Sequence, residues 1–173
     1  MQETMSSFPV RLLLLAALGL VTLGCTAEST LHSLQNDFSK RKAELNELKV
    51  IMLKLSLAAK DFRFFSSRVA GGGSDMLDFF DNKSRVPVSQ ALEAQFQKNR
   101  EDLLTLQSVV RKLGIHYVSV DKSNEAVWVT IEGGGVLASD KGYLFAGKKD
   151  ITEYHLDHYA PIPSEDKWYA FVD

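Results

Sequence analysis

The stretch that decides the fold class runs from Ala126 to Ile131 and has the sequence Ala-Val-Trp-Val-Thr-Ile. β-branched and aromatic residues dominate it, which favours a β-strand. Side chains alternate along a strand, so Val127, Val129 and Ile131 share one side and Trp128 lies on the other. Both sides carry large apolar residues. The strand therefore belongs to a sheet in which both faces must be at least partly shielded from water.

Similar short segments flank this strand over the last 60 residues. Residues 115–120 alternate in the same way, and Asp140-Lys141-Gly142 has the composition of a hairpin turn. The expected strands beside Ala126–Ile131 are Ile115–Val120, Val136–Ser139, Tyr143–Ala146 and Lys167–Val172. We predict an antiparallel meander of four or five strands that forms a sheet domain over residues 114–173.

The closing strand has two different sides. Tyr169 and Phe171 share one side. Trp168 and Ala170 share the other, where small Ala170 leaves room for a helix to pack. We therefore expect a helix on the Ala170 side and a free surface on the Tyr169 side.

Aromatic residues on this sheet form a candidate partner surface. Tryptophan and tyrosine commonly anchor protein interfaces. Residues 114–173 also carry five Lys or Arg against ten Asp or Glu, which favours a partner with a basic complement. The alternative is that the aromatic side chains fill a small core. The candidate partner surface consists of Trp128, Tyr169 and Phe171.

Upstream of the sheet, the apolar residues follow heptad spacing over residues 31–69 and again over residues 89–113. Spacing of three and four residues is typical of long helices in coiled coils or hairpins. Gly71 to Gly73 would end the first helix, and Gly114 would cap the second. We predict a helical hairpin within residues 25–113, with the sheet packed on its second helix. The predicted fold class is α+β: a long, coiled-coil-like hairpin followed by a small antiparallel meander.

The N-terminal segment has the composition of an export signal. Arg11 is followed by twelve uncharged, almost wholly apolar residues, Leu12 to Leu23, and then by Gly24-Cys25. The apolar core of a signal peptide is about 7–15 residues long, whereas a membrane-spanning helix needs about 20. Residues 1–24 are therefore predicted to be a signal peptide.

Gly24-Cys25 resembles the lipobox of bacterial lipoproteins, in which a small residue precedes the cysteine that is lipidated. The sequence departs from that pattern at Thr22, where the class favours leucine. The resemblance implies lipidation of Cys25 and a lipid anchor in the membrane. Thr26 stands where an Asp would retain a lipoprotein at the inner membrane, so the outer membrane, facing the periplasm, is expected. Two alternatives stay open: ordinary cleavage before Glu28, which gives a soluble secreted protein, and an uncleaved anchor.

One cluster of possible metal ligands occurs, at Glu153, His155, Asp157 and His158. On a strand, Glu153, His155 and Asp157 would share one side and His158 would lie on the other, whereas on a helical turn His155 and His158 would meet. Zinc needs three or four ligands with supporting hydrogen bonds, and nothing in this spacing demands that they be assembled. We interpret the cluster as a polar surface loop, with no metal and no cofactor. A periplasmic metal-dependent enzyme that uses His155 and His158 is the rival hypothesis.

Other chemistry finds little support in the sequence. Residues 142–148 have the glycine and lysine spacing of a phosphate loop, but Lys149 stands where Ser or Thr would bind magnesium, and the intervening residues resemble a strand. Nucleotide is therefore not an expected ligand. The net charge of -2 gives no overall basic field, so nucleic acid is not expected either. A G-x-S-x-G nucleophile motif does not occur.

These patterns together predict a lipid-anchored envelope protein that acts as a binding module and not as an enzyme. Its expected partner is a protein or a second copy of the chain. Besides the metal-dependent enzyme, a purely structural coiled-coil spacer is an alternative.

Overall fold

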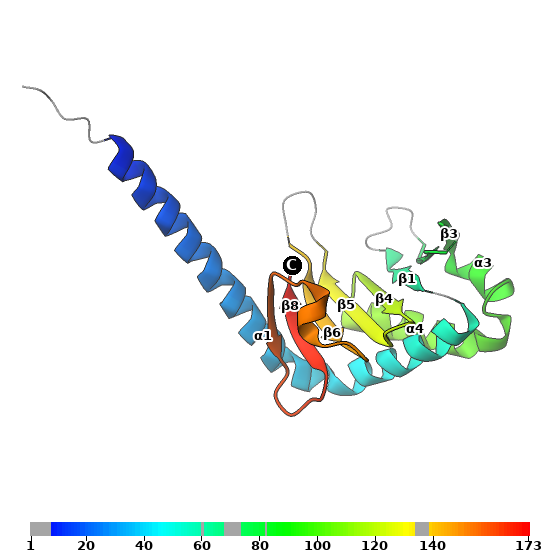
Figure 1. Cartoon of the computed structure of the whole chain (residues 1–173). Coiled ribbons are helices and arrows are strands. Elements are labelled where there is room, and N and C mark those ends of the chain that lie inside the picture. Colours follow the sequence, from blue (N-terminus) through cyan, green and yellow to red (C-terminus); the bar gives the residue numbers. More distant parts are fainter. Residues whose placement is uncertain (1–7, 60, 68–73, 82, 134–138) are drawn as a thin grey trace, which may run out of the picture.

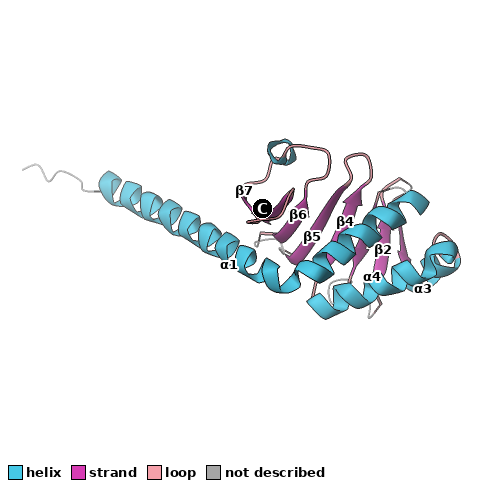
Figure 2. Cartoon of the chain, turned by 90° about the horizontal axis from the view of Figure 1, so that it is seen from below, coloured by secondary structure: helices cyan, strands magenta, loops and turns pink. Residues whose placement is uncertain are grey.

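The computed structural model describes residues 8–173 except 60, 68–73, 82 and 134–138, and it describes side chains from residue 26 onward. The chain folds as one eight-stranded antiparallel sheet with helices across one face (Figures 1 and 2). The predicted α+β class is confirmed. The predicted hairpin is not.

The sheet collects strands from almost the whole length of the chain after the long helix. Their order across the sheet is β3-β2-β1-β4-β5-β6-β8-β7, and every neighbouring pair is antiparallel. The strands are β1 (Phe62–Phe65), β2 (Met76–Phe79), β3 (Ser84–Pro87), β4 (Tyr117–Asp121), β5 (Ala126–Glu132), β6 (Lys141–Phe145), β7 (His158–Pro161) and β8 (Trp168–Val172).

Two helices lie antiparallel to each other on the same face of the sheet (Figure 2). Ion pairs of 2.7 Å join Glu44 to Lys112 and Lys54 to Asp102, which sets the antiparallel direction. Gly114, with φ 67°, caps the second of these helices in the left-handed conformation. The helical elements are α1 (Phe8–Ala58), α3 (Val88–Glu93) and α4 (Arg100–Leu113), with 3₁₀ turns η1 (Gln97–Asn99) and η2 (Ile151–Tyr154).

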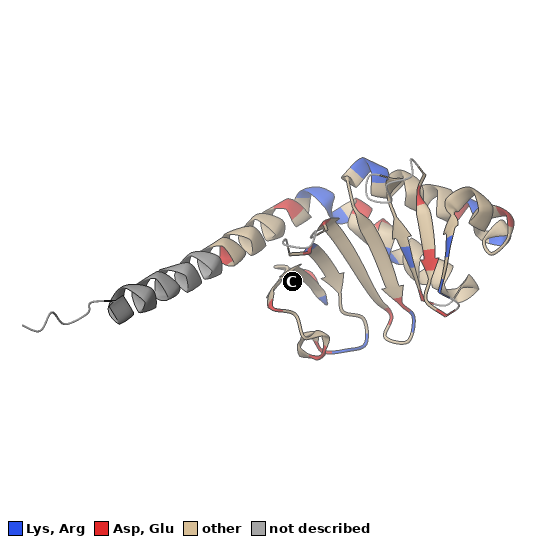
Figure 3. Cartoon of the chain, turned by 90° about the horizontal axis from the view of Figure 1, so that it is seen from above, with Lys and Arg blue, Asp and Glu red and all other residues tan. Residues whose placement is uncertain are grey.

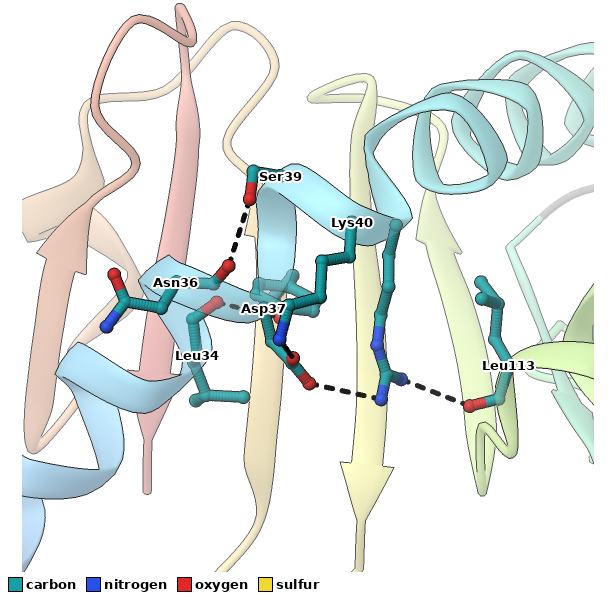
Figure 4. Close-up of polar contacts among 8 residues, drawn as sticks. Leu34, Asn36, Asp37, Ser39, Lys40 and Leu113 are labelled. Carbon is teal, nitrogen blue, oxygen red and sulfur yellow. Dashed lines mark hydrogen bonds and ion pairs between the residues drawn. The ribbon is translucent and has the colours of Figure 1, made fainter.

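The long helix α1 changes direction where it reaches the sheet, so its N-terminal part projects away from the body (Figures 1 and 2). Two side-chain hydroxyls bond to backbone carbonyls of α1 in this region. Ser39 donates to the carbonyl of Asn36 at 3.0 Å, and Tyr143 of the sheet donates to the carbonyl of Leu34 at 2.9 Å (Figure 4). Side chains that bond into the helical ladder in this way are a recognised cause of helix bending.

The core lies between these two helices and the sheet. Phe38 of α1 meets Tyr143 and Trp168 of the sheet with ring centroids 5.3 and 5.4 Å away. Farther along the helices, Leu48 and Leu106 are fully buried. Edge-to-face ring pairs and buried leucines contribute most of the packing energy of such a layer.

The helical hairpin is the main correction to the sequence analysis. The first predicted helix extended to residue 69, but α1 ends at Ala58, and residues 62–65 form β1. The expected connector 74–88 contains β2 and β3, and the second predicted helix is broken between α3 and α4. The sheet therefore spans the boundary that we placed at residue 114. Four-residue strands are too short for periodicity to separate them from helix.

The meander also differs from its prediction in detail. Lys141 and Gly142 were expected in a hairpin turn, but they lie in β6 and pair with Glu132 and Thr130 of β5. Residues 158–161, expected in a loop, form the edge strand β7. The predicted strand Val136–Ser139 falls mostly outside the described residues.

Candidate binding site on the open face of the sheet

The face of the sheet opposite α1 and α4 is called the open face below. Trp168 and Ala170 belong to the core under the helices, so the prediction that a helix covers the Ala170 side is confirmed. Strand alternation then places Tyr169 and Phe171 on the open face. Figure 3 looks onto this face, and most of the ribbon within the strands there is neither acidic nor basic.

The three residues of the predicted partner surface lie near one another on the open face. Trp128 meets Phe171 edge-to-face at 5.4 Å and is half-buried. Phe171 is only 2% exposed, because it packs in a small cluster with Leu144 and Ile151, the latter from η2. Tyr169 is half-buried beside Tyr159, at 6.2 Å. Trp128 and Tyr169 therefore reach the surface, whereas Phe171 supports them from below.

Arg63 of β1 is a charged residue on the open face, and three aromatic rings surround its guanidinium group. Its guanidinium carbon lies 4.8 Å from the ring centroid of Tyr117, 5.4 Å from that of Phe80 and 5.6 Å from that of Phe65. Aromatic faces attract guanidinium groups, and three of them fix this one in place. In β-sheet register, Arg63 is followed across the sheet by Ser119 of β4 and Trp128 of β5.

A hollow of about 280 Å³ opens beside this arginine. It is smaller than most drug-sized ligand sites and matches a small metabolite. Its wall contains basic and acidic side chains, and both hydroxyl and N–H groups can donate hydrogen bonds there. The hollow, which we call the Arg63 pocket, is lined by Arg63, Tyr117, Ser119, Trp128, Thr130, Asp140, Phe171 and Asp173.

The acidic side of the Arg63 pocket is anchored by hydrogen bonds. The hydroxyl of Tyr117 donates to the carboxylate of Asp140. Burial, with a contribution from this bond, raises the pKa of Tyr117 above its ordinary value. The backbone N–H of Asp173 donates to the backbone carbonyl of Asp140 at 2.8 Å, so both acidic residues are held at the same end of the pocket.

The histidines of the rival metal hypothesis are not among the residues that line this pocket. His155 ends the η2 turn with a left-handed φ of 52°, and His158 is exposed on the edge strand β7. Glu153 instead completes a capping box with Asp150 at the start of η2. Within the described residues, the structure does not gather three His, Cys, Asp or Glu side chains into a metal-binding group.

The structure also gives the positions of the predicted lipidation residue, Cys25, and of the glycine-lysine motif at residues 142–148. Cys25 lies within α1, and its side chain is outside the described residues. The described helices include none that is long and apolar enough to cross a membrane. Residues 142–145 of the motif belong to β6, and the rest of it enters the turn that follows, so the motif does not form a phosphate loop.

Sequence analysis missed the part of this site that β1 and β2 provide. Arg63, Phe65 and Phe80 were assigned to a helix and a connector. The alternation of Phe62 and Phe64, buried, with Arg63 and Phe65, half-buried, is the signal that could have found β1. It was hidden because Phe62 also continues the heptad spacing of α1.

Comparisons of this chain with known protein families, with curated proteins and with solved structures found no match. Function is therefore argued from the chemistry of the open face and of the N-terminal segment.

Proposed function

We propose that this chain is an exported lipoprotein, anchored to the outer membrane through Cys25, whose sheet binds a protein partner in the periplasm. The observation that carries the binding role is the aromatic open face. Beside Trp128 and Tyr169, it exposes Phe80 by 46% and Tyr159 by 38%. Half-exposed aromatic side chains of this kind supply most of the affinity in protein interfaces.

The charge of the C-terminal part of the chain, which contains β4 to β8, favours a basic partner. Residues 114–173 carry ten acidic and five basic residues, whereas the whole chain has a net charge of only -2. Complementary charge raises the rate of encounter, and aromatic contacts then provide affinity. The partner that would suit this face is another envelope protein with a basic surface that is extended or concave.

The course of α1 supports the membrane anchor. Leu31 is the first of the buried leucines that join α1 to the core, and it follows Cys25 by six residues. Six helical residues span about 9 Å, so a lipid on Cys25 would hold the sheet close to the membrane. Several acyl chains on one cysteine would make this attachment stable.

Lipidation is tested by the intact mass of the protein from the membrane fraction, with Cys25→Ser as the matched variant. We expect an N-terminus at Cys25 with added acyl mass, and we expect Cys25→Ser to leave the membrane or to stay unprocessed. An N-terminus at Glu28 without acyl mass would refute the anchor. A chain that retains residues before Cys25 would support the uncleaved alternative.

Partner binding is tested by capture from envelope extracts with Tyr169→Ser. Loss of this half-buried ring should weaken capture while leaving the melting temperature nearly unchanged. The double variant His155→Ala with His158→Ala serves as the control and should capture normally. The reverse pattern, in which only the histidine variant loses activity, would favour the metal-dependent enzyme instead.

A further inference from the structure

Arg63 forms no ion pair with any residue that the structure describes, and aromatic rings surround its guanidinium group instead. Among the described residues, no carboxylate, hydroxyl or carbonyl accepts a hydrogen bond from it. Its Nε is buried without a partner, and its contacts are the rings of Phe65, Phe80 and Tyr117. Because rings satisfy the flat faces of a guanidinium but not its N–H edge, the terminal N–H groups remain available for a ligand.

The neighbouring Arg85 shows what a structural arginine looks like on the same face. Its guanidinium lies 4.7 Å from the centroid of Phe65, so it contacts the same ring as Arg63. Unlike Arg63, it donates two hydrogen bonds, of 2.5 and 2.9 Å, to the carboxylate of Asp78. Of these two arginines, Arg85 therefore donates to a carboxylate of the chain, whereas Arg63 donates to none of the described residues.

The Arg63 pocket also contains acidic groups. Asp140 and Asp173 line it together with Arg63, so its charged residues amount to one positive and two negative. A simple anion would be attracted by Arg63 but repelled by the two carboxylates. A ligand that carries an ammonium group as well as an anionic group meets both requirements. The partly exposed Trp128 offers a flat apolar surface for the rest of such a molecule.

We propose that the Arg63 pocket binds a small zwitterion of the amino-acid or short-peptide class. Its carboxylate pairs with the terminal N–H groups of Arg63, and the hydroxyl of Ser119 lies on the same wall. Its ammonium group lies toward Asp173, and its apolar side chain packs on Trp128. The proposal concerns a small ligand and stands whether or not the open face also binds a protein or the chain carries a lipid.

The test is a titration of the full chain in detergent with L-leucine, followed by calorimetry and by the NMR signal of the Trp128 indole. 4-Methylpentanoate is leucine without the ammonium group, and 3-methylbutylamine is leucine without the carboxylate. We expect saturable binding of leucine with a shift of the Trp128 signal, and binding at least about tenfold weaker for each single-charge analogue. Absence of saturable leucine binding, or equal binding of the three compounds, overturns the proposal.

Variants then assign the ligand's two charges. Arg63→Gln should weaken leucine binding by about tenfold or more, and Asp173→Asn should weaken leucine but not 4-methylpentanoate. Arg85→Gln is the matched control, because it removes an arginine from the same aromatic cluster, and it should bind leucine normally. Melting temperatures identify any variant that fails to fold, and Arg63→Lys then replaces Arg63→Gln. Normal leucine binding by a folded Arg63 variant contradicts the site.

Discussion

Gly142 shows how strongly one residue can depend on its neighbours across the sheet. It lies in β6, opposite Thr130 of β5. A Cβ atom at this position would lie 1.9 Å from the backbone oxygen of Val129. Because the obstacle is backbone, no rotation of a side chain can relieve it. The glycine that sequence analysis considered as part of a phosphate-loop spacing is required instead for close packing of two strands.

Gly142→Ala should therefore destabilise the protein severely. Overpacking against side chains already costs about 1–3 kcal/mol, and a clash with backbone should cost more. We expect loss of the cooperative thermal transition or failure to accumulate as folded protein, measured by circular dichroism. Gly133→Ala is the control, because its added methyl would meet a side-chain atom of His116 at 3.2 Å, a contact that a shift of a few tenths of an ångström relieves. Similar melting of the Gly142 variant and the wild type would contradict the register of β5 and β6.

Buried polar groups at the residue scale join elements that the sequence separates. The carboxylate of Asp75, only 2% exposed, accepts hydrogen bonds from the backbone N–H of Ser67 and from Gln107 of α4. Arg111 of α4 adds an ion pair of 2.7 Å. These contacts attach the start of β2 to α4, although 32 residues separate Asp75 from Gln107. A buried carboxylate is tolerated here because each interaction satisfies part of it.

At the scale of elements, α1 and α4 form one layer because each buries a row of leucines against the sheet. Leu48 of α1 and Leu106 of α4 are both 0% exposed. The ion pairs between the helices are exposed and contribute little, since surface pairs are typically worth below about 1 kcal/mol. Apolar burial, not charge, therefore holds the layer together.

Leu48→Ala and Leu106→Ala should each lower the free energy of unfolding by about 2–5 kcal/mol, because each leaves a cavity in the core. Matched controls exist on the outer sides of the same helices, where Val50 is 60% exposed and Leu104 is 37% exposed. Val50→Ala and Leu104→Ala should change stability by only about 0.5 kcal/mol. Urea unfolding measures all four, and equal effects at the buried and exposed sites would show that the helix faces are misassigned.

The whole molecule should lose stability at high pH, because buried Tyr143 and partly buried Tyr154 resist ionisation. Burial raises the pKa of Tyr154 to about 12 and that of Tyr143 further still, above the ordinary value near 10. The folded protein therefore holds these protons more tightly than the unfolded chain does. Their stabilising contribution is complete below about pH 10 and falls as the pH rises through about 12.

Urea unfolding between about pH 8 and about pH 11.5 tests this dependence. The free energy of unfolding should decline with pH in the wild type. It should decline less in the double variant Tyr143→Phe with Tyr154→Phe, because phenylalanine has no proton to lose. Comparison of the two proteins removes the contribution of lysines, which titrate in the same range. Parallel curves for wild type and variant would contradict the burial of these hydroxyls.

The sequence by itself determined the elements whose pattern is long or strongly alternating. The strand at residues 126–131, the closing strand near residues 168–172 and the side of Ala170 that faces a helix follow from alternation alone. The helical character of residues 31–58 follows from apolar spacing repeated over several turns. These patterns suffice because each repeats its period several times. Only one type of secondary structure then brings all of the apolar side chains to the same buried side.

Only the tertiary structure decided where α1 ends and how the binding site is assembled. Phe62 fits the heptad spacing of α1 as well as the alternation of a strand, and pairing with β4, more than 50 residues away, selects the strand. That pairing brings Arg63 into one pocket with Tyr117 and Trp128, and Asp173, which follows β8, completes the wall. Hydrogen bonds between distant strands have no local signature, because their partners are chosen by the fold of the whole chain.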